Sequence, residues 1–256
     1  MLVDVSKHEG VATFTLNAPP ANTYSYEMMK ELDAAVLDVR MDDAIHVVML
    51  RGAGEKFFCA GADIAMLDTA TPSFKYAFCL HANETLKRLE QTSKLVIAAI
   101  NGHCVGGGLE LALACDLRVT IKGKHKLGLP EVKLGVLPGT GGTARLARLV
   151  GKGRALELML EGKNLDVDEA HAMGLVSRVF DTMADVEGYA RSFCPPGAAS
   201  KAVGLIKRSV QAGMHMSFEG HLALERELQQ QLFTSLDAKE GIKAYVEKRA
   251  ARFQGK

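Results

Sequence analysis

The sequence predicts an α/β protein: a core of alternating strands and helices, followed by a helical C-terminal region. Up to Phe180, short β-branched segments alternate with amphipathic helical segments, which is typical of sheets covered by helices. Beyond Phe180 only helical patterns follow, and Pro195-Pro196 interrupts them. A chain of 256 residues can bury a substantial core. We therefore expect a core over residues 1–195 and a helical region over residues 196–256.

The predicted strands are short apolar runs bounded by turn-forming residues. They cover residues 2–6, 11–16, 46–50, 95–100 and 117–121. Glu9-Gly10 lies between the first two, which predicts a hairpin at the start of the chain. The run that ends at Asn101-Gly102 is apolar throughout, so we expect it to be buried.

The predicted helices are segments in which apolar residues recur at helical spacing. They cover residues 25–40, 74–90, 109–115, 184–193, 199–212, 217–233 and 237–252. In the first of these, Met28, Leu32 and Val39 lie on one face, and Ser25 is a candidate N-cap.

The composition excludes several classes of protein. A net charge of +1 gives no basic surface for nucleic acid, and no apolar run reaches the ~18 residues of a membrane span. The five cysteines form no CxxC pair, which indicates reduced thiols. The first residues, MLVDVSKHEG, have neither the apolar stretch of a signal peptide nor the arginine-rich character of a transit peptide. We expect a cytoplasmic protein without a nucleic-acid or membrane partner.

A run of glycines beside two acidic residues is the most informative motif. Gly106-Gly107-Gly108 opens a predicted helix that contains Glu110, and Glu131 follows 21 residues later, after Pro130. Glycine leaves backbone N–H groups accessible to a ligand, where they can hold a developing oxyanion, and two carboxyl groups can move protons. Other interpretations remain open for each part: a turn that needs positive φ, and first-turn acids favoured by a helix dipole.

Other chemistries lack the residues they need. Residues 139–144 fit the loose GxGxxA form of a dinucleotide fingerprint, but they follow Pro138 directly, and only residues 133–137 could form the preceding strand. We therefore disfavour nicotinamide binding. The sequence contains no GxSxG, HExxH, P-loop or EF-hand motif. For His103, beside the glycine run, we expect a structural hydrogen bond.

Three ordered motifs resemble the crotonase (enoyl-CoA hydratase/isomerase) superfamily. They are Phe58-Cys59-Ala60-Gly61-Ala62-Asp63-Ile64, the segment from Ile100-Asn101-Gly102 to Cys115-Asp116, and the segment from Leu129-Pro130-Glu131 to Gly142-Thr143. The resemblance covers nearly the whole chain, including residues 241–253. It implies a core of repeated ββα units wound into a spiral, followed by a helical trimerisation region.

The resemblance implies a role for each residue of the motifs. The backbone N–H groups of Ala62 and Gly107 match the family's oxyanion hole, which binds the thioester carbonyl. Glu110 and Glu131 match the two family glutamates: one accepts a proton from water, and Glu131 delivers a proton to the α-carbon. Gly139 matches a position whose N–H group orients the water.

The resemblance also implies contacts with the CoA part of a substrate. The matching residues are Lys56, Ala60, Gly61, Asp63, Ile64 and Lys248. The two lysines would meet the nucleotide and its phosphates, and the backbone of residues 60–64 would line the adenine pocket.

Two positions depart from the family pattern. Ala65 stands where many hydratases have a lysine, which removes one expected phosphate contact. Asn22-Thr23-Tyr24-Ser25 replaces the common Asn-Ala-Leu run, so that the large, polar-tipped Tyr24 lies in a segment near the thioester. The acyl pocket is therefore expected to differ from that of a plain short-chain hydratase.

Because both glutamates are present, the resemblance is strongest to the hydratases, which add water reversibly across the 2,3 double bond of an enoyl-CoA thioester. Two alternatives remain: an enoyl-CoA delta-isomerase that uses the same enolate, and a non-catalytic acyl-CoA-binding subunit.

The family resemblance implies that the partner is an acyl-CoA thioester. It implies no metal or redox cofactor, because CoA comes with the substrate. It also implies that the chain assembles as a homotrimer or a dimer of trimers. The acyl chain is not specified by the motifs.

Overall fold

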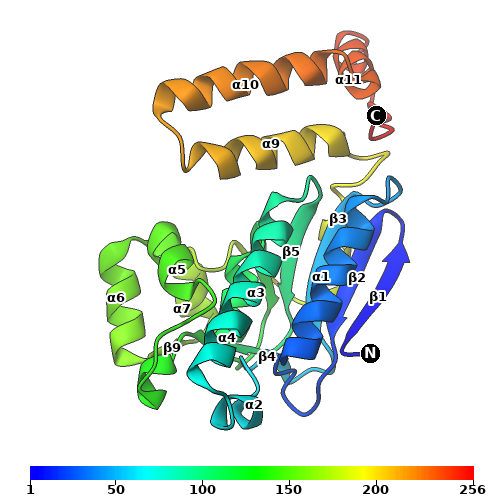
Figure 1. Cartoon of the computed structure of the whole chain (residues 1–256). Coiled ribbons are helices and arrows are strands. Elements are labelled where there is room, and N and C mark those ends of the chain that lie inside the picture. The colour runs from blue at the N-terminus through cyan, green and yellow to red at the C-terminus, as the bar shows by residue number, and fades with distance from the viewer.

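The computed structural model describes the whole chain, Met1 to Lys256, and contains two β-sheets (Figure 1). The six-stranded sheet has the order β1 (Val3–His8), β2 (Val11–Leu16), β3 (Val47–Gly52), β5 (Leu95–Ile100), β7 (Leu117–Ile121) and β10 (Arg178–Phe180). The four-stranded sheet has the order β4 (Phe57–Cys59), β6 (His103–Val105), β8 (Leu127–Gly128) and β9 (Asn164–Leu165). The predicted hairpin is present, because β1 and β2 pair antiparallel.

The chain winds between the two sheets as a spiral. Each turn places one strand in the large sheet and the next in the small one: β3 leads to β4, β5 to β6, and β7 to β8. Asn101 stabilises one corner of this path, since its side chain accepts a hydrogen bond from the Gly52 N–H (2.9 Å) and donates to the Gly52 and Gly54 carbonyl groups. The repeated ββα architecture predicted for the core is confirmed.

In chain order the helices of the core are α1 (Tyr26–Arg40), α2 (Ile64–Asp68), α3 (Pro72–Gln91), α4 (Gly107–Leu113), α5 (Gly142–Val150), α6 (Lys152–Glu161), α7 (Val167–Ala172) and α8 (Met183–Arg191). Helices lie on both faces of the large sheet, with α1 and α3 on one face and α8 on the other. Val48 and Leu50 of β3 belong to the main core with α1 and α3, whereas Val47 and Met49 pack with α8 in a second core. Burial on both faces explains why these parallel strands are apolar throughout.

The small sheet and several short helices lie outside the sequence-based prediction. Its strands have only two or three residues, which is too short for a period of two to be recognised. Residues 133–137, which alone could have formed the strand before the disfavoured dinucleotide fingerprint, form no strand, because Glu131–Leu134 form a 3-10 turn. The disfavoured dinucleotide fingerprint therefore has no strand in front of it.

The C-terminal region consists of α9 (Ser200–Gly213), α10 (Phe218–Phe233) and α11 (Leu236–Val246), with α10 alongside α9 (Figure 1). The prediction of a last helix extending to residue 252 is wrong, because the chain leaves the helix after Val246. Lys248 adopts a left-handed conformation with φ of 55°, and the Arg249 guanidinium folds back onto the Glu240 carboxylate at 2.6 Å. No helix is both long and apolar enough to cross a membrane.

A buried ion pair fastens α9 to the core. The Lys207 ammonium lies 2.8 Å from the Asp116 carboxylate, and their side chains are only 4% and 9% exposed. Burial raises the pKa of Asp116 and lowers the pKa of Lys207. The pair is compensated by further hydrogen bonds: Asp116 accepts from the Val96 N–H, and Lys207 donates to the Leu89 and Lys94 carbonyl groups.

We predict that Lys207→Ala lowers the free energy of unfolding by about 3–5 kcal/mol, because it leaves the Asp116 carboxylate buried without its partner. The matched control is Lys201→Ala, an exposed lysine on the same helix, which should change the free energy by less than about 0.5 kcal/mol. Chemical denaturation of both variants measures the difference. Equal stabilities would show that the ion pair does not stabilise the attachment of α9.

Candidate active site

The three consecutive glycines have different structural roles. Only Gly106 has positive φ, at 57°, where it turns the chain from β6 into α4. Gly107 and Gly108 are required for close packing instead: a Cβ atom on Gly108 would overlap the Cys59 carbonyl oxygen, and one on Gly107 would overlap the Tyr24 hydroxyl group. Gly107 is the first residue of α4, so its N–H group has no acceptor within the helix.

The segment after β4 lies directly against the start of α4. A Cβ atom on Gly61 would lie 3.1 Å from the Gly107 nitrogen. The neighbouring Ala62 forms an isolated parallel bridge with Tyr24, in which Tyr24 and Asp63 donate the hydrogen bonds and the Ala62 N–H does not take part. The structure thus brings Ala62 and Gly107 together, and both N–H groups are available for one ligand oxygen.

Glu110 lies one turn further along α4 and is only 2% exposed. Its Oε1 atom accepts hydrogen bonds from the Thr140 N–H (2.8 Å) and the Gly142 N–H (2.7 Å). Its Oε2 atom accepts a short hydrogen bond from the Thr140 hydroxyl. Three donors are therefore directed at one carboxyl group, which suits a group that has to accept a proton. One acceptor position on Oε2 remains for a further donor such as water.

Glu131 has the opposite environment. It is half-buried at the start of the 3-10 turn, and its Oε2 atom is buried without a hydrogen-bond partner. Burial, with a smaller contribution from the Glu110 charge, raises the pKa of Glu131 to about 7. Its Oε1 atom lies near Gly106, because a Cβ there would be 3.3 Å away. The two carboxyl groups therefore differ in environment, because donors surround Glu110 and burial raises the pKa of Glu131, which suits one proton acceptor and one proton donor.

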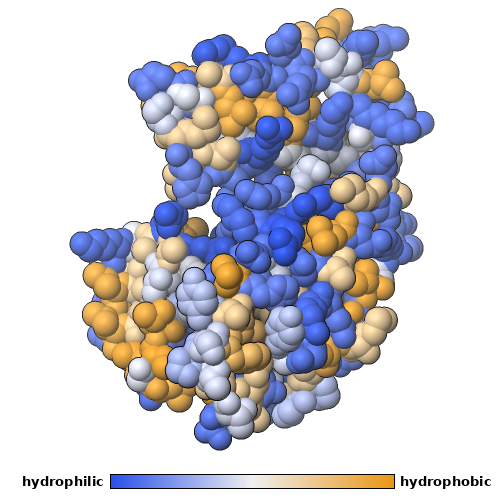
Figure 2. All heavy atoms as spheres, in the orientation of Figure 1, coloured by the Kyte–Doolittle hydropathy of each residue, from blue (hydrophilic) through white to orange (hydrophobic).

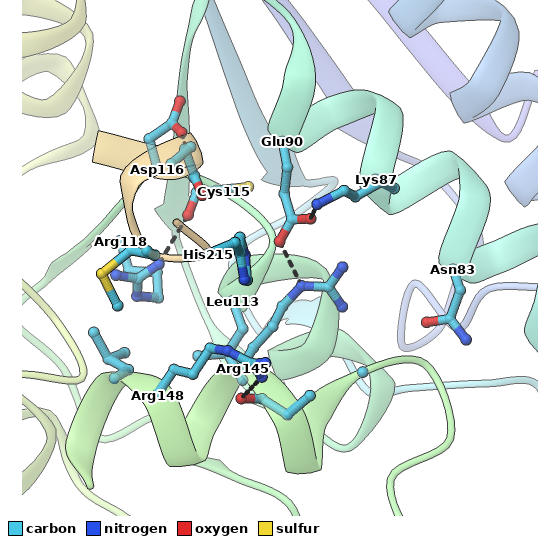
Figure 3. A pocket seen from close by; sticks show the side chains of 15 residues that line it. Asn83, Lys87, Glu90, Leu113, Cys115, Asp116, Arg118, Arg145, Arg148 and His215 are labelled. Atoms are coloured by element: carbon cyan, nitrogen blue, oxygen red, sulfur yellow. Dashed lines mark hydrogen bonds and ion pairs between the residues drawn. The ribbon is translucent and has the colours of Figure 1, made fainter. Parts of the chain in front are cut away.

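The loop from Gly139 to Gly141 is supported from its outer side. Arg145 pairs with Glu90 at 2.7 Å (Figure 3). Arg145 also donates to the Thr140 carbonyl group (2.9 Å), and Asn83 reaches the Gly139 carbonyl group at 3.5 Å. A cavity of about 410 Å³ opens on this side, and neither catalytic-site glutamate lines it. Thr140, which donates to Glu110 through its N–H and its hydroxyl, therefore belongs to a loop fixed from both sides.

The expected CoA-contacting residues lie in two separate places. Lys56 and Ile64 are exposed close to Ala60 and Gly61, and Ile64 is 60% exposed at the start of α2. The carboxylate of Asp63 caps α2 by accepting from the Met66 N–H (3.0 Å), which is a structural role.

Lys248 is not brought to this site within one chain. It follows α11, and the chain beyond α11 contacts Pro196 and His46. His46 lies immediately before the start of β3. Ala62 lies beyond the other end of the strands, and Figure 1 places α11 and α2 at opposite ends of the molecule.

The sequence did not identify Thr140 and Gly142 as partners of Glu110, although both lie in a segment that it singled out. No periodicity relates residues 30 positions apart, so only the fold reveals the contact. His103 has the expected structural role: its Nδ1 atom accepts from the Lys126 N–H at 3.0 Å. No three His, Cys, Asp or Glu side chains are grouped as a metal site would require.

Comparisons with known proteins agree with this geometry. The model of the enoyl-CoA hydratase/isomerase family matches residues 6–256. A short-chain-enoyl-CoA hydratase of Clostridium acetobutylicum is 37% identical over 250 residues, covering 96% of this chain and 95% of the relative. A crotonyl-CoA hydratase of Syntrophomonas wolfei is 36% identical, covering 98% and 97%. A crystal structure of an enoyl-CoA hydratase from Geobacillus kaustophilus superposes with a TM-score of 0.97 at 45% identity, covering 100% of this chain and 97% of that one.

We predict that Gly107→Ala reduces turnover of enoyl-CoA thioesters by about 100-fold or more, because the new Cβ atom would displace either the Tyr24 hydroxyl or the Gly107 N–H. The larger Gly107→Val should abolish turnover. Gly153→Ala on α6, where a Cβ meets open space, is the control and should leave turnover unchanged. Thermal melting of the same samples separates lost activity from lost folding. Parental turnover by Gly107→Val would contradict a role of this amide.

Proposed function

Because the chain belongs to the enoyl-CoA hydratase/isomerase family, we propose that it is an enoyl-CoA hydratase. The enzyme adds water reversibly across the 2,3 double bond of an enoyl-CoA thioester and gives a 3-hydroxyacyl-CoA. The observation that best supports this assignment is the different environment of the two glutamates: Glu110 accepts from three donors, and Glu131 has a pKa of about 7. Hydration needs both a proton acceptor for water and a proton donor for carbon.

In the proposed reaction, the thioester oxygen lies between the N–H groups of Ala62 and Gly107. As water adds to the β-carbon, negative charge moves onto this oxygen, and each donor stabilises the resulting enolate by about 3–4 kcal/mol. The N-terminus of α4 adds its positive dipole end at the same place. Backbone donors suit this task because they are already fixed before the substrate binds.

The two glutamates complete the addition. Water lies between them, oriented by the Gly139 N–H, and its oxygen bonds to the β-carbon while Glu110 takes its proton on Oε2. Protonated Glu131 then gives its proton to the α-carbon, and the enolate becomes a thioester carbonyl group again. One proton is taken and one is given, and transfer between the two carboxyl groups through bulk solvent restores the starting state.

We assign the CoA part of the substrate to the surface around α2. The backbone of Ala60 and Gly61 and the exposed side chain of Ile64 would meet the adenine, and Lys56 would meet a phosphate. Lys248 can contact the same CoA molecule only from a second copy of the chain, because within one chain it lies at the opposite end of the molecule from α2. No metal or redox cofactor takes part in this proposal, and the expected compartment is the cytoplasm.

We propose that the assembly is a homotrimer or a dimer of trimers. The C-terminal helices leave large apolar side chains exposed on their surface: Ile206, Val210, Met214, Phe218, Phe233, Ile242, Tyr245 and Val246. Further apolar side chains are exposed on α5 and α6, and Figure 2 shows apolar atoms over these helices and over α10. Apolar surface of this extent on several helices is typical of contacts between copies.

The central test is hydration itself. Glu110→Gln and Glu131→Gln should each reduce hydration by at least ~100-fold, because each removes one proton-transfer group. Loss of the conjugated enoyl-thioester absorbance, first with crotonyl-CoA and then with a panel of acyl chains, measures the rate. Glu157→Gln, an exposed glutamate on α6, is the control and should behave like the parent.

Since Glu131 must be protonated, hydration by the parent enzyme should fall as the pH rises through about 7.

Three outcomes of this assay would contradict the proposal. If both single variants retain near-parental turnover, the glutamates are not the proton-transfer groups. If a 3-enoyl-CoA gains the conjugated absorbance but no 2-enoyl-CoA is hydrated, the protein is a delta-isomerase. If no acyl-CoA changes its absorbance, the chain is a binding subunit.

The assembly is tested by light scattering coupled to gel filtration. At micromolar concentration the mass should equal three or six chains of 27.5 kDa.

Lys248→Ala should raise KM for the thioester while changing kcat by less than about twofold, because Lys248 contacts only the non-reacting part of the substrate. A stable, fully active monomer would contradict both the assembly and the assignment of Lys248.

A further inference from the structure

Tyr24 is a buried tyrosine that the mechanism above does not use. Its side chain is 2% exposed, and its ring packs 5.9 Å from that of Phe78. Its hydroxyl oxygen lies 3.1 Å from the Thr140 Oγ1 atom and against the α-carbon of Gly107. A phenylalanine would fill the same space with the same apolar contacts, so the hydroxyl group requires a separate explanation.

The hydrogen bonds around Thr140 have a defined direction. The Thr140 hydroxyl has one proton, and it donates this proton to Glu110 Oε2. The Tyr24 hydroxyl must then be the donor to Thr140. Burial, followed by the nearby Glu110 charge, raises the pKa of Tyr24 well above its usual value, so the phenol keeps its proton. The result is a chain of hydrogen bonds from Tyr24 through Thr140 to Glu110.

The backbone of Tyr24 is also part of the site. Its N–H donates to the Gly61 carbonyl (2.9 Å), and its carbonyl accepts from the Asp63 N–H (3.0 Å). These two bonds fix the backbone on either side of Ala62. One residue therefore contacts the segment of each proposed oxyanion donor and, through Thr140, the proposed base.

We propose that Tyr24 is a positioning residue for the hydration reaction: its hydroxyl holds the Thr140 hydroxyl in the orientation that donates to Glu110, which fixes the Glu110 carboxyl group and directs its remaining acceptor position toward water. This inference rests on the proposed function. Hydrogen bonds arranged in a chain polarise and strengthen one another, so loss of the first donor weakens the second bond. Tyr24 touches no reacting atom in this scheme and acts only through Thr140.

The titratable groups around Glu110 determine what a pH profile reports. Glu131 and Tyr24 face it, the Cys59 and Cys79 thiols lie near Tyr24, and Lys75 faces Glu131. The acid must be protonated, so hydration falls at high pH through Glu131, whose pKa is about 7. Tyr24 makes no hydrogen bond to Glu131, so removing the Tyr24 hydroxyl should leave this high-pH limb unchanged.

The decisive variant is Tyr24→Phe, which removes the hydroxyl and keeps the ring. We expect kcat to fall about 3- to 10-fold, as expected for one lost hydrogen bond, with KM nearly unchanged. Thr140→Val removes the bond to the carboxylate itself and should reduce kcat about 10- to 100-fold, whereas Thr140→Ser should restore most of it. Tyr26→Phe, a more exposed tyrosine two residues away that makes no hydroxyl hydrogen bond, is the control and should match the parent in rate and pH profile.

The double variant Tyr24→Phe/Thr140→Val tests the chain of hydrogen bonds. If Tyr24 acts through Thr140, adding Tyr24→Phe to Thr140→Val changes kcat by less than about twofold. If the two effects simply multiply, or if Tyr24→Phe alone keeps the parental kcat, the proposal is wrong and Tyr24 only fills space. A parent enzyme that hydrates no enoyl-CoA would instead remove the proposed function, so the two failures are distinguishable. Melting temperatures of all variants show whether the fold is kept.

Discussion

The site depends on the direct contact between two stretches of backbone, the segment after β4 and the start of α4. No side chain separates Gly61 from Gly107, and Gly108 packs on the Cys59 carbonyl group. This contact brings the Ala62 and Gly107 N–H groups together, and it places Glu110 one turn into the helix, within reach of the loop at Thr140. The spiral supplies the contact, because consecutive turns lay β4 beside β6 in the small sheet.

Two residues of the same type have opposite surroundings in this site. Glu110 is almost completely buried, yet three hydrogen-bond donors compensate the burial of its carboxyl group. Glu131 is less buried, yet one of its oxygens has no partner, and burial raises its pKa to about 7. The exposed fraction of a side chain is therefore a poor guide to its environment here. The number of hydrogen-bond donors that point at each carboxyl group distinguishes the two residues.

The sequence was informative where a pattern is local and long. The strands at β5 and β7, the helix α1 with its Ser25 cap, and the ordered glycine and glutamate motifs were all predicted, because propensity and spacing act over neighbouring residues. The two-residue strands β8 and β9 and the end of the last helix at Val246 were not, since long-range pairing and the fold of Arg249 onto Glu240 determine them. Tyr24 was recognised as unusual, but its partner Thr140 is 116 positions away.

The proposed oxyanion donors are main-chain groups, and this affects how the enzyme can be studied and how it can change. No substitution deletes a main-chain amide, so a scan would report the glutamates directly, would pass over Ala62, and would report Gly107 only through the Cβ atom that the change adds. The enolate-binding groups therefore depend on no side chain of their own, but they are sensitive to added bulk at the glycines. A scaffold of this kind can acquire new reactions by exchanging residues such as Tyr24, Glu110 and Glu131, with the charge-stabilising centre inherited intact.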